Sequence, residues 1–339
     1  MQASNSRRYK VLVLLFILAA AVFFSAPQAT ALVIKVGSVA PEGSPWDRAL
    51  KRIALDWQKI SGGRVTMKIY AGGIAGDEPD MIRKMRINQI QAAAMTGSGL
   101  GKINPDFLVY QLPFLTQNDE ELDYVFEKLR PKLEALLEQK GFTFLAIIKS
   151  GWLRFFAKKK VITPADFQKL KFFVMEGSPE IDQAWKAMGF HIVPLPPNDA
   201  FAALQSGMVE VFSASPLTAA AMQWFALAPH MTDIYWTPLT AGLIISNQSW
   251  RRIPADLRPK LKSATQRALD DLQAEVIAVE NQAIEIMKEN GLVIHDVPPA
   301  AFEEWESLVE TGFSILIGDV ISRDLYEEAK RIVEEFRQR

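Results

Sequence analysis

The chain has 339 residues, with 38 Lys and Arg against 39 Asp and Glu, and it contains no cysteine. This balance of charge is not typical of a nucleic-acid-binding protein, and the lack of cysteine excludes disulfides and lipid attachment to an N-terminal Cys. The fold must therefore be held together by core packing. Since single cores stop growing near about 250–300 residues, the length predicts two lobes.

The N-terminus has the pattern of a secretion signal. Arg7, Arg8 and Lys10 precede the apolar stretch 11–24, and Ala29-Thr30-Ala31 provides a small-residue cleavage site. We therefore predict a cleavable signal peptide over residues 1–31 and export to the periplasm. The alternative is an uncleaved anchor helix. After this segment no run of eighteen apolar residues occurs, so the exported chain is predicted to be soluble.

The first half of the exported chain alternates strand and helix patterns. Strand patterns at 32–40, 64–73 and 90–97 are separated by helix patterns at 45–60 and 77–88. This order predicts a parallel sheet with ligands at the carboxyl ends of its strands. The cluster Gly97–Gly101 follows such an end. It is too short for a phosphate-binding loop, and Ile103 stands where the hydroxyl residue is needed, so we predict a strand end and turn, with Lys102 in solvent.

Further elements follow in the second half. A helix is predicted over 120–141, with a possible break at Pro131, before a strand at 142–152; helices end at Gly189 and Gly207, each next to a strand. Apolar or small residues recur every three or four positions from Leu257 to Asn290, and Gly291 follows. A helix of this length would be roughly 50 Å long. It is either broken once within one lobe or braces both lobes.

Several segments together resemble one family. They include the block "AGGIAGDEPDMIRKMRINQIQAAAM", the segments 104–115 and 162–210, and "SNQSWRRIPADLRPKL". In their order and spacing they resemble the extracytoplasmic solute-binding proteins of TRAP transporters, the DctP family. The resemblance covers nearly all of residues 32–339. It implies an α/β fold of the two-lobe periplasmic-binding-protein type, each lobe a mixed sheet flanked by helices, with a long bridging helix and a ligand held between the lobes.

The resemblance also implies an organisation of the chain and its partners. Residues 32–150 would form mainly the first lobe and 151–235 mainly the second, with a return to the first lobe at 236–256. The bridging helix would occupy 257–291, and 292–339 would pack on the lobes. The partners implied are a small-molecule ligand and TRAP membrane permease subunits. Some members that lack the usual arginine act beside a helical-repeat periplasmic lipoprotein, which is the third partner suggested. No cofactor is implied.

The sequence departs from the family at the positions that hold a carboxylate ligand. Aligned on Leu170-Lys171-Phe172, the arginine of the family falls on Phe173, and its acid and amide fall on Ser213 and Ala214. A second arginine position falls on Leu153, with Arg154 one residue later, which on a strand points to the opposite face. A guanidinium contact to a carboxylate is worth on the order of 1.5–3 kcal/mol. We therefore predict an apolar or amphipathic ligand, such as a fatty acid or another lipid fragment.

The candidate binding residues are those expected at the cleft. They are Trp46, Met95, Thr96, Ser98, Trp152, Arg154, Phe173, Met175, Phe212, Ser213, Ser215, Pro216 and Trp236. For each aromatic residue the alternative is an ordinary place in the core. The alternative ligand is an organic acid held by Arg154 as a relocated clamp.

Other functions have weaker support. His191, His230 and His295 form no metal-binding motif, no serine-hydrolase motif occurs, and the spacing of Met208, Met222 and Met231 is too irregular for a copper site. The acidic runs 119–121 and 303–304 are typical of solvated helix faces. We therefore predict that the protein is not an enzyme. An exported sensor that presents its ligand to a receptor remains the alternative to a transport function.

Overall fold

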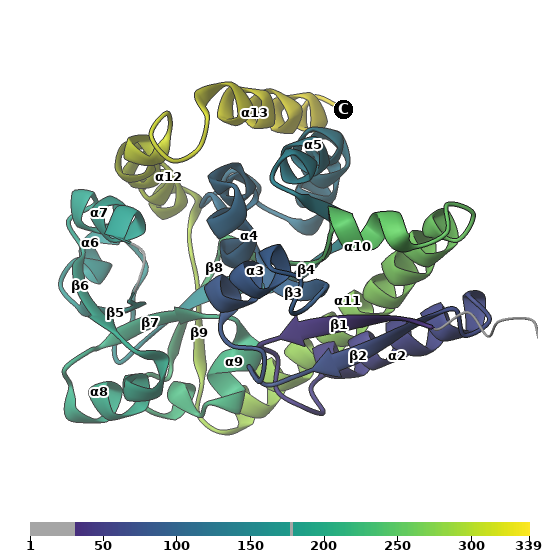
Figure 1. The fold of residues 1–339 in the computed structure, drawn as a ribbon. Helices are drawn as coiled ribbons and strands as arrows, with labels where there is room; N and C mark the ends of the chain where they lie inside the picture. The colour runs from purple at the N-terminus through teal and green to yellow at the C-terminus, as the bar shows by residue number, and fades with distance from the viewer. Residues whose placement is uncertain (1–30, 177–178) are drawn as a thin grey trace, which may run out of the picture.

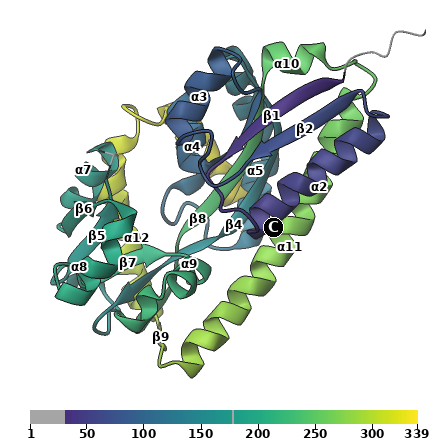
Figure 2. The ribbon, with the colours of Figure 1, turned by 60° about the horizontal axis from the view of Figure 1, so that its bottom comes forward.

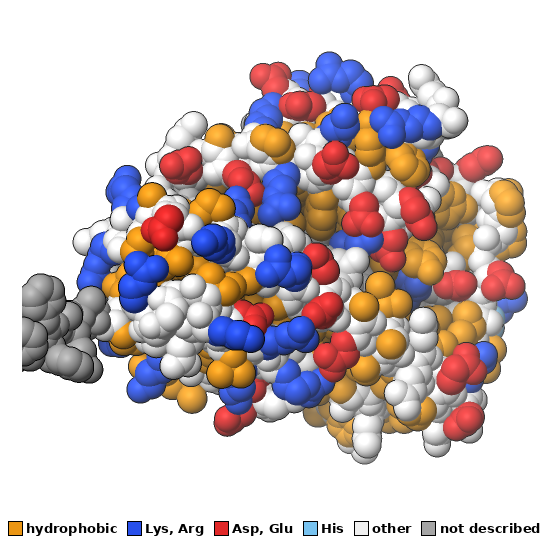
Figure 3. Space-filling view, turned by 90° about the vertical axis from the view of Figure 1, so that its right-hand side faces the viewer, with side chains coloured by type: hydrophobic (Ala, Val, Ile, Leu, Met, Phe, Trp, Pro, Cys, Tyr) orange, Lys and Arg blue, Asp and Glu red, His pale blue; other side chains and the backbone are white. Residues whose placement is uncertain are grey.

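The computed structural model describes residues 31–176 and 179–339. The predicted signal peptide lies outside the described residues, apart from Ala31. Figure 1 shows two lobes joined by a pair of long strands, with the C-terminal helices lying across the top. In the described ranges no helix has both the length and the apolar character needed to cross a membrane. On the face drawn in Figure 3, positive and negative side chains are interspersed.

One nine-stranded sheet runs through the described part of both lobes, in the order β2-β1-β3-β8-β4-β7-β5-β6, with β9 paired to β8. In the first lobe, β1 (Leu32–Ser38) pairs in parallel with β2 (Val65–Tyr70) and β3 (Ala92–Thr96). In the second lobe, β5 (Lys171–Met175) pairs in parallel with β6 (His191–Leu195) and β7 (Val211–Ala214). The parallel pairing predicted for the first lobe is present, the second lobe has parallel pairs as well, and the sheet as a whole is mixed.

Two long antiparallel strands cross between the lobes. They are β4 (Phe142–Ala157) and β8 (His230–Ser246), and the short β9 (Val293–Asp296) pairs in parallel with the start of β8. The register between β4 and β8 shifts three times: between Phe144 and Ala146, between Lys149 and Trp152, and between Leu153 and Phe155. The second shift spans Gly151, which has φ +88°, and the last two lie where the two lobes meet. Such bulges bend a strand and re-aim its side chains. The strand therefore continues beyond its predicted end at Trp152.

Helices cover both faces of the sheet. In the first lobe they are α2 (Pro45–Ile60), α3 (Glu78–Arg86), α4 (Gly97–Ile103), η1 (Pro105–Gln111), α5 (Asp119–Gln139) and α10 (Asn247–Arg252). In the second lobe they are α6 (Pro164–Phe167), α7 (Pro179–Ala187), η2 (Pro197–Asp199), α8 (Ala200–Ser206), α9 (Pro216–Ala221) and η3 (Trp224–Ala226). The boundaries of α2 match the prediction, because the Ser44 side chain accepts a hydrogen bond from the Asp47 backbone N–H at the start of the helix. The possible break at Pro131 does not occur, since α5 is one helix.

The glycine cluster forms the short helix α4 rather than the turn that was predicted. The hydroxyl of Thr96 accepts a hydrogen bond from the Gly99 backbone N–H, which caps the helix. The glycines allow close packing: a Cβ at Gly99 would lie 2.5 Å from the Glu78 carboxyl group, and one at Gly97 would collide with Thr240. Lys102 is exposed, as expected. The glycines therefore bring α4 close to its neighbours.

The long helix α11 (Arg258–Glu289) is continuous and contacts both lobes. Its length is about 48 Å at 1.5 Å per residue. In its first half Leu261 and Leu272 pack into the cluster that contains β1 and α2, while Met287 at its end packs with the second lobe. Figure 2 shows α11 running beside α2 and on toward β9. The sequence left two possibilities for this helix, and the structure has the unbroken one.

The C-terminal segment completes the core. It contains α12 (Pro299–Phe313), η4 (Ser314–Leu316) and α13 (Arg323–Arg337). Trp305 of α12 packs against Phe155 and Trp236, and its indole N–H donates a 2.8 Å hydrogen bond to the Ile162 carbonyl. On α13, Arg337 makes two hydrogen bonds with the buried Glu121 of α5. These contacts fasten the segment to both lobes.

Candidate functional site

Three of the predicted residues share one face of three adjacent strands. Arg154 on β4 lies opposite Ala214 on β7, and Phe212 on β7 lies opposite Phe173 on β5. Residues paired in this way point to the same side of a sheet, and the face alternates along each strand. Arg154, Phe212 and Phe173 therefore lie on one face, and Ser213 points to the other.

Phe173 lies in an apolar environment at the position where the family has its arginine. It is 4% exposed and packs edge-on against Trp224, with 5.8 Å between the ring centroids. Phe212 stacks on Phe156 at 5.0 Å in the same cluster. Met175, two residues after Phe173, is 66% exposed at the end of β5. This part of the face is thus apolar from the core to the surface.

Arg154 is the one cation among the predicted residues, and it is buried to 7% exposure. Its guanidinium carbon lies 3.6 Å from the centroid of the Tyr235 ring, and its Nε lies 3.6 Å from Oδ1 of Asp233. The second distance is too long for a hydrogen bond. The buried Nε and Nη1 atoms donate no hydrogen bond within the described structure. A buried guanidinium with free donors is suited to bind an anion.

Glu280 of α11 lies near Arg154. A Cβ on Gly151 would be 2.8 Å from its Oε2, so the carboxyl group rests directly on the bulge of β4. Burial raises the pKa of Glu280 to about 7; Arg154 lowers it and Asp119 raises it further. Its Oε1 is buried and has no hydrogen-bond partner in the described structure. This carboxyl group is therefore partly protonated near neutral pH.

The neighbouring charges are arranged around the start of α5. Lys149 of β4 donates to Oδ2 of Asp123 at 2.8 Å and lies 3.5 Å from Oδ1 of Asp119. The indole N–H of Trp152 donates to the same Asp119 oxygen at 3.0 Å. The Asp119 carboxylate thus has partners in Trp152 and Lys149, whereas Arg154 and Glu280 have buried atoms without a hydrogen-bond partner.

The other predicted residues have mainly structural surroundings. Met95 and Trp236 are buried in the core, where Trp236 stacks on Trp185 at 5.2 Å. The hydroxyl and backbone N–H of Thr96 bond to Glu78, and the Ser98 hydroxyl lies 3.4 Å from Gln111. The remaining residues are placed as follows: Trp46 is half-buried against the core around α2 and β1, Trp152 is buried, Ser213 has an unpartnered hydroxyl, and Ser215 and Pro216 begin α9.

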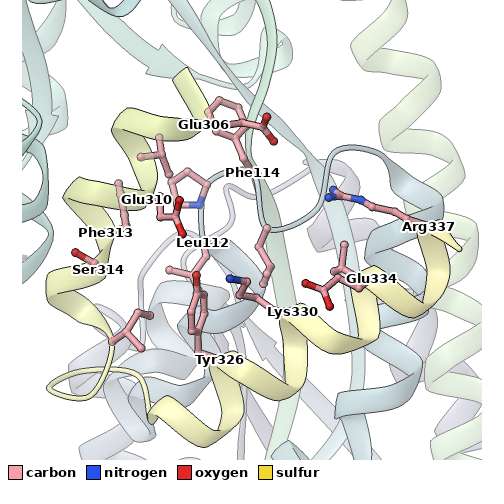
Figure 4. Close-up of a pocket in the computed structure, with 15 residues that line it drawn as sticks. Leu112, Phe114, Glu306, Glu310, Phe313, Ser314, Tyr326, Lys330, Glu334 and Arg337 are labelled. Carbon is pink, nitrogen blue, oxygen red and sulfur yellow. The ribbon is translucent and has the colours of Figure 1, made fainter. Parts of the chain in front are cut away.

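A separate cavity of about 220 Å³ lies between α12, α13 and the loop after η1. Figure 4 shows Phe114, Phe313 and Tyr326 at this cavity together with the charged Lys330 and Glu310. None of the thirteen predicted residues lines it. The cavity is therefore distinct from the face that carries Arg154 and Phe173.

Histidines that are distant in sequence come together elsewhere. Nδ1 of His230 lies 2.9 Å from Nε2 of His295, where β8 pairs with β9. Across residues 31–176 and 179–339, no group of three or more potential ligands is arranged to hold a metal ion.

Asp233, Tyr235 and Glu280 are not among the residues predicted from the sequence. Glu280 is one of several acidic residues on a helix whose pattern indicates only which side is apolar. Tyr235 and Asp233 lie within the last register shift of the crossing strands, where strict alternation fails. A glycine at a strand interior, Gly151, is the signal that could have indicated a close approach there.

Known proteins resemble the chain in both sequence and fold. The family described as bacterial extracellular solute-binding protein, family 7 (DctP), matches residues 36–313. The C4-dicarboxylate-binding periplasmic protein DctP of Rhodobacter capsulatus is 24% identical over 284 residues, 82% of this chain and 84% of that protein.

Solved structures of TRAP periplasmic solute-binding proteins share the fold. An apo, open structure from Rhodobacter sphaeroides has a TM-score of 0.81 and 20% identity, covering 90% of this chain and 99% of that one. A structure from Sulfurospirillum deleyianum with bound succinate has a TM-score of 0.75 and 20% identity, covering 89% and 99%. Because the family match spans most of its length, the chain belongs to family 7 of the bacterial extracellular solute-binding proteins, the DctP family, and is a solute-binding protein of TRAP transporters rather than an enzyme.

Proposed function

We propose that this protein captures an amphipathic acid in the periplasm and delivers it to a TRAP permease. The acid group of the ligand would bind Arg154, and its apolar part would lie toward Phe173 and Met175. The observation that carries the proposal is the buried Arg154, whose Nε and Nη1 donate no hydrogen bond, on the same face as Phe173. This combines the apolar ligand predicted from the sequence with its alternative, the relocated arginine.

The energetics of burial favour a carboxylate at Arg154. A buried charge without a hydrogen-bonding partner is costly, and a charge-assisted hydrogen bond contributes on the order of 1.5–3 kcal/mol. Asp233 is too far from Nε to fill this role and is 44% exposed at its side chain. A ligand carboxylate would supply an acceptor for one of these two buried donors, in a charge-assisted hydrogen bond.

The apolar character of the rest of the ligand follows from Phe173. One relative is named as a C4-dicarboxylate-binding protein, and one solved structure contains bound succinate. A second carboxylate in this protein would meet the apolar cluster of Phe173 and Phe212, where an unpaired anion is strongly disfavoured. A ligand with one acid group and an apolar chain, such as a fatty acid, fits both parts of the face.

Other expectations complete the proposal. Residues 1–31 would direct export. Residues 32–150 and 236–256 would form mainly the first lobe, and 151–235 mainly the second. Trp46, Thr96 and Ser98 from the first lobe, with Trp152, Ser213, Ser215 and Pro216, would border the ligand; Met95 and Trp236 would support it from the core. A helical-repeat lipoprotein remains a predicted partner.

The proposal is tested by mass spectrometry of small molecules released from natively purified protein. We expect a carboxylic acid with an apolar chain, which is lost in Arg154→Ala and in Phe173→Arg. Arg52→Ala serves as the control, because Arg52 of α2 forms an exposed ion pair with Asp271 of α11. A small dicarboxylate would contradict the apolar part of the proposal. A neutral lipid retained in Arg154→Ala would contradict the role of Arg154.

A further inference from the structure

The guanidinium group of Arg154 and the carboxyl group of Glu280 lie near each other where the lobes join, and both have buried atoms without a hydrogen-bond partner. Arg154 has two buried donors without acceptors, and Glu280 has a buried oxygen without a partner. Arg154 is the cation that lowers the pKa of Glu280, yet the two residues form no ion pair within 4.0 Å in the described structure. Each of the two groups thus has unused hydrogen-bonding capacity, which a third group bound beside both of them could satisfy.

We propose that Glu280 is a second ligand contact, which in its neutral form donates a hydrogen bond to the acid group held by Arg154, so that binding takes up a proton. This inference rests on the proposed function, since it requires an anionic ligand at Arg154. No covalent bond changes. The proton comes from solvent and resides on the Glu280 carboxyl group, while the ligand remains a carboxylate.

The surroundings of Glu280 favour this proton. The Glu280 carboxyl group lies against Gly151 of β4 and near Arg154 of the same strand. Asp119, at the start of α5, adds negative charge nearby. Asp119 is itself bound by Trp152 and lies 3.5 Å from Lys149. On β8, Asp233 and Tyr235 contact Arg154 rather than Glu280.

Among the described residues, Arg154 is the cation that acts on Glu280, and the cations of the packed helices have other partners. On α11 itself, Glu275 forms an ion pair with Arg48 of α2. The sequence of α9, which packs against α11, contains no charged residue between Pro216 and Ala221. Arg154 is therefore the cation left to offset both Glu280 and an incoming anion.

A ligand anion would strengthen the neutral form of Glu280. Burial already raises the pKa of this carboxyl group to about 7, with Arg154 lowering it and Asp119 raising it. A second negative charge close by raises a carboxyl pKa further, as in paired carboxylates that share one proton. A protonated carboxyl group has an O–H to donate, whereas an ionised one only accepts. Two negative charges beside one guanidinium are thereby avoided.

The inference predicts that the affinity for an anion falls as pH rises. Above the pKa that Glu280 has in the free protein, proton uptake weakens binding by up to about tenfold for each pH unit. Glu280→Gln keeps a donor, the amide N–H, but cannot take up a proton. This variant should bind the anion with the same affinity across the pH range.

The test is isothermal titration of the full exported chain with sodium decanoate at pH 7.5 and 8.5, in phosphate and in Tris. These buffers differ in ionisation enthalpy, so the difference in heat measures the protons taken up. For the wild type we expect uptake of up to one proton and an affinity about tenfold lower at pH 8.5. For Glu280→Gln we expect no uptake and equal affinities. Glu275→Gln, an exposed position on the same helix, should match the wild type.

The outcomes separate this inference from the proposed function. Decanoate binding by the wild type without proton uptake would overturn the role of Glu280 and leave the proposed function standing. The same holds if Glu280→Gln retains the pH dependence. Failure of the folded wild type to bind decanoate at either pH would overturn the amphipathic acid as ligand, and the role of Glu280 with it. Thermal melting of each variant verifies that it is folded.

Discussion

The guanidinium group of Arg154 is stacked on the ring of Tyr235, with its carbon 3.6 Å from the ring centroid. Both residues lie where β4 and β8 shift register at the junction of the lobes. Stacking occupies the flat face of the guanidinium and leaves its edge, which carries the N–H donors, free for an anion. Tyr235 thereby holds Arg154 in place without using its hydrogen bonds.

This relationship predicts the effect of changing Tyr235. Tyr235→Leu removes the aromatic face, and a cation–π contact of about 0.5–2 kcal/mol corresponds to a loss of affinity for decanoate of about 2-fold to 30-fold. Tyr235→Phe keeps the face and should bind like the wild type. Titration calorimetry measures both. Equal affinities for the Leu and Phe variants would show that the ring does not position Arg154.

Glu280 predicts a pH-dependent contribution to stability. Its pKa is raised from 4.5 to about 7, chiefly by burial, so the folded state holds this proton more tightly than the unfolded state does. As pH rises from about 4.5 to 7 the folded state loses stability from this group, and above 7 the full cost is present. Glu280→Gln removes this cost. Its effect on the free energy of unfolding should therefore be more stabilising at pH 8 than at pH 4, by on the order of 2–3 kcal/mol. Urea unfolding at the two pH values measures the difference, and an equal effect at both would contradict the prediction.

Patterns of apolar residues sufficed to predict the framework of this protein. The alternation in β1 and the stripe from Pro45 to Ile60 give the right elements because side chains facing a core repeat with the period of the local structure. Arg154 is a candidate from the sequence, but alternation along a strand does not show which residues its side chain contacts. Its partners Tyr235 and Glu280 come from distant segments, and the bulges that bring them together break the alternation on which the prediction depends.

Residues whose type suits either a site or a core could not be assigned from sequence. Trp236 is 1% exposed and contacts Trp185, Phe114 and Phe155, which are far from it in the chain. The glycines of α4 likewise have a packing role that depends on Glu78 and Thr240 lying beside them. In both cases tertiary contacts decide the role, and a single sequence does not encode them in a local pattern.

Gly151 is predicted to tolerate alanine poorly. Its φ of +88° disfavours any side chain, and a Cβ would lie 2.8 Å and 2.9 Å from the two carboxyl oxygens of Glu280. Gly141 has a similar φ of +94° but nothing within 4 Å of a Cβ, so Gly141→Ala measures the backbone strain alone, about 1–2 kcal/mol. Gly151→Ala should cost at least about 1 kcal/mol more, because Glu280 must move. In a Glu280→Ala background this excess should disappear, and a persisting excess in urea unfolding would show that another neighbour resists the Cβ.

Thr265 is predicted to fasten the bridging helix to the first lobe. The indole N–H of Trp57 on α2 donates a 2.9 Å hydrogen bond to the Thr265 hydroxyl on α11, and both residues are fully buried. Thr265→Val keeps the shape but leaves the indole N–H without an acceptor, which costs about 1–3 kcal/mol. Thr265→Ser retains the hydroxyl and removes only a methyl group, so it should be less destabilising. The midpoint of urea unfolding, followed by tryptophan fluorescence, compares the two variants. If Thr265→Val is as stable as Thr265→Ser, the hydrogen bond does not contribute to holding α11 against α2.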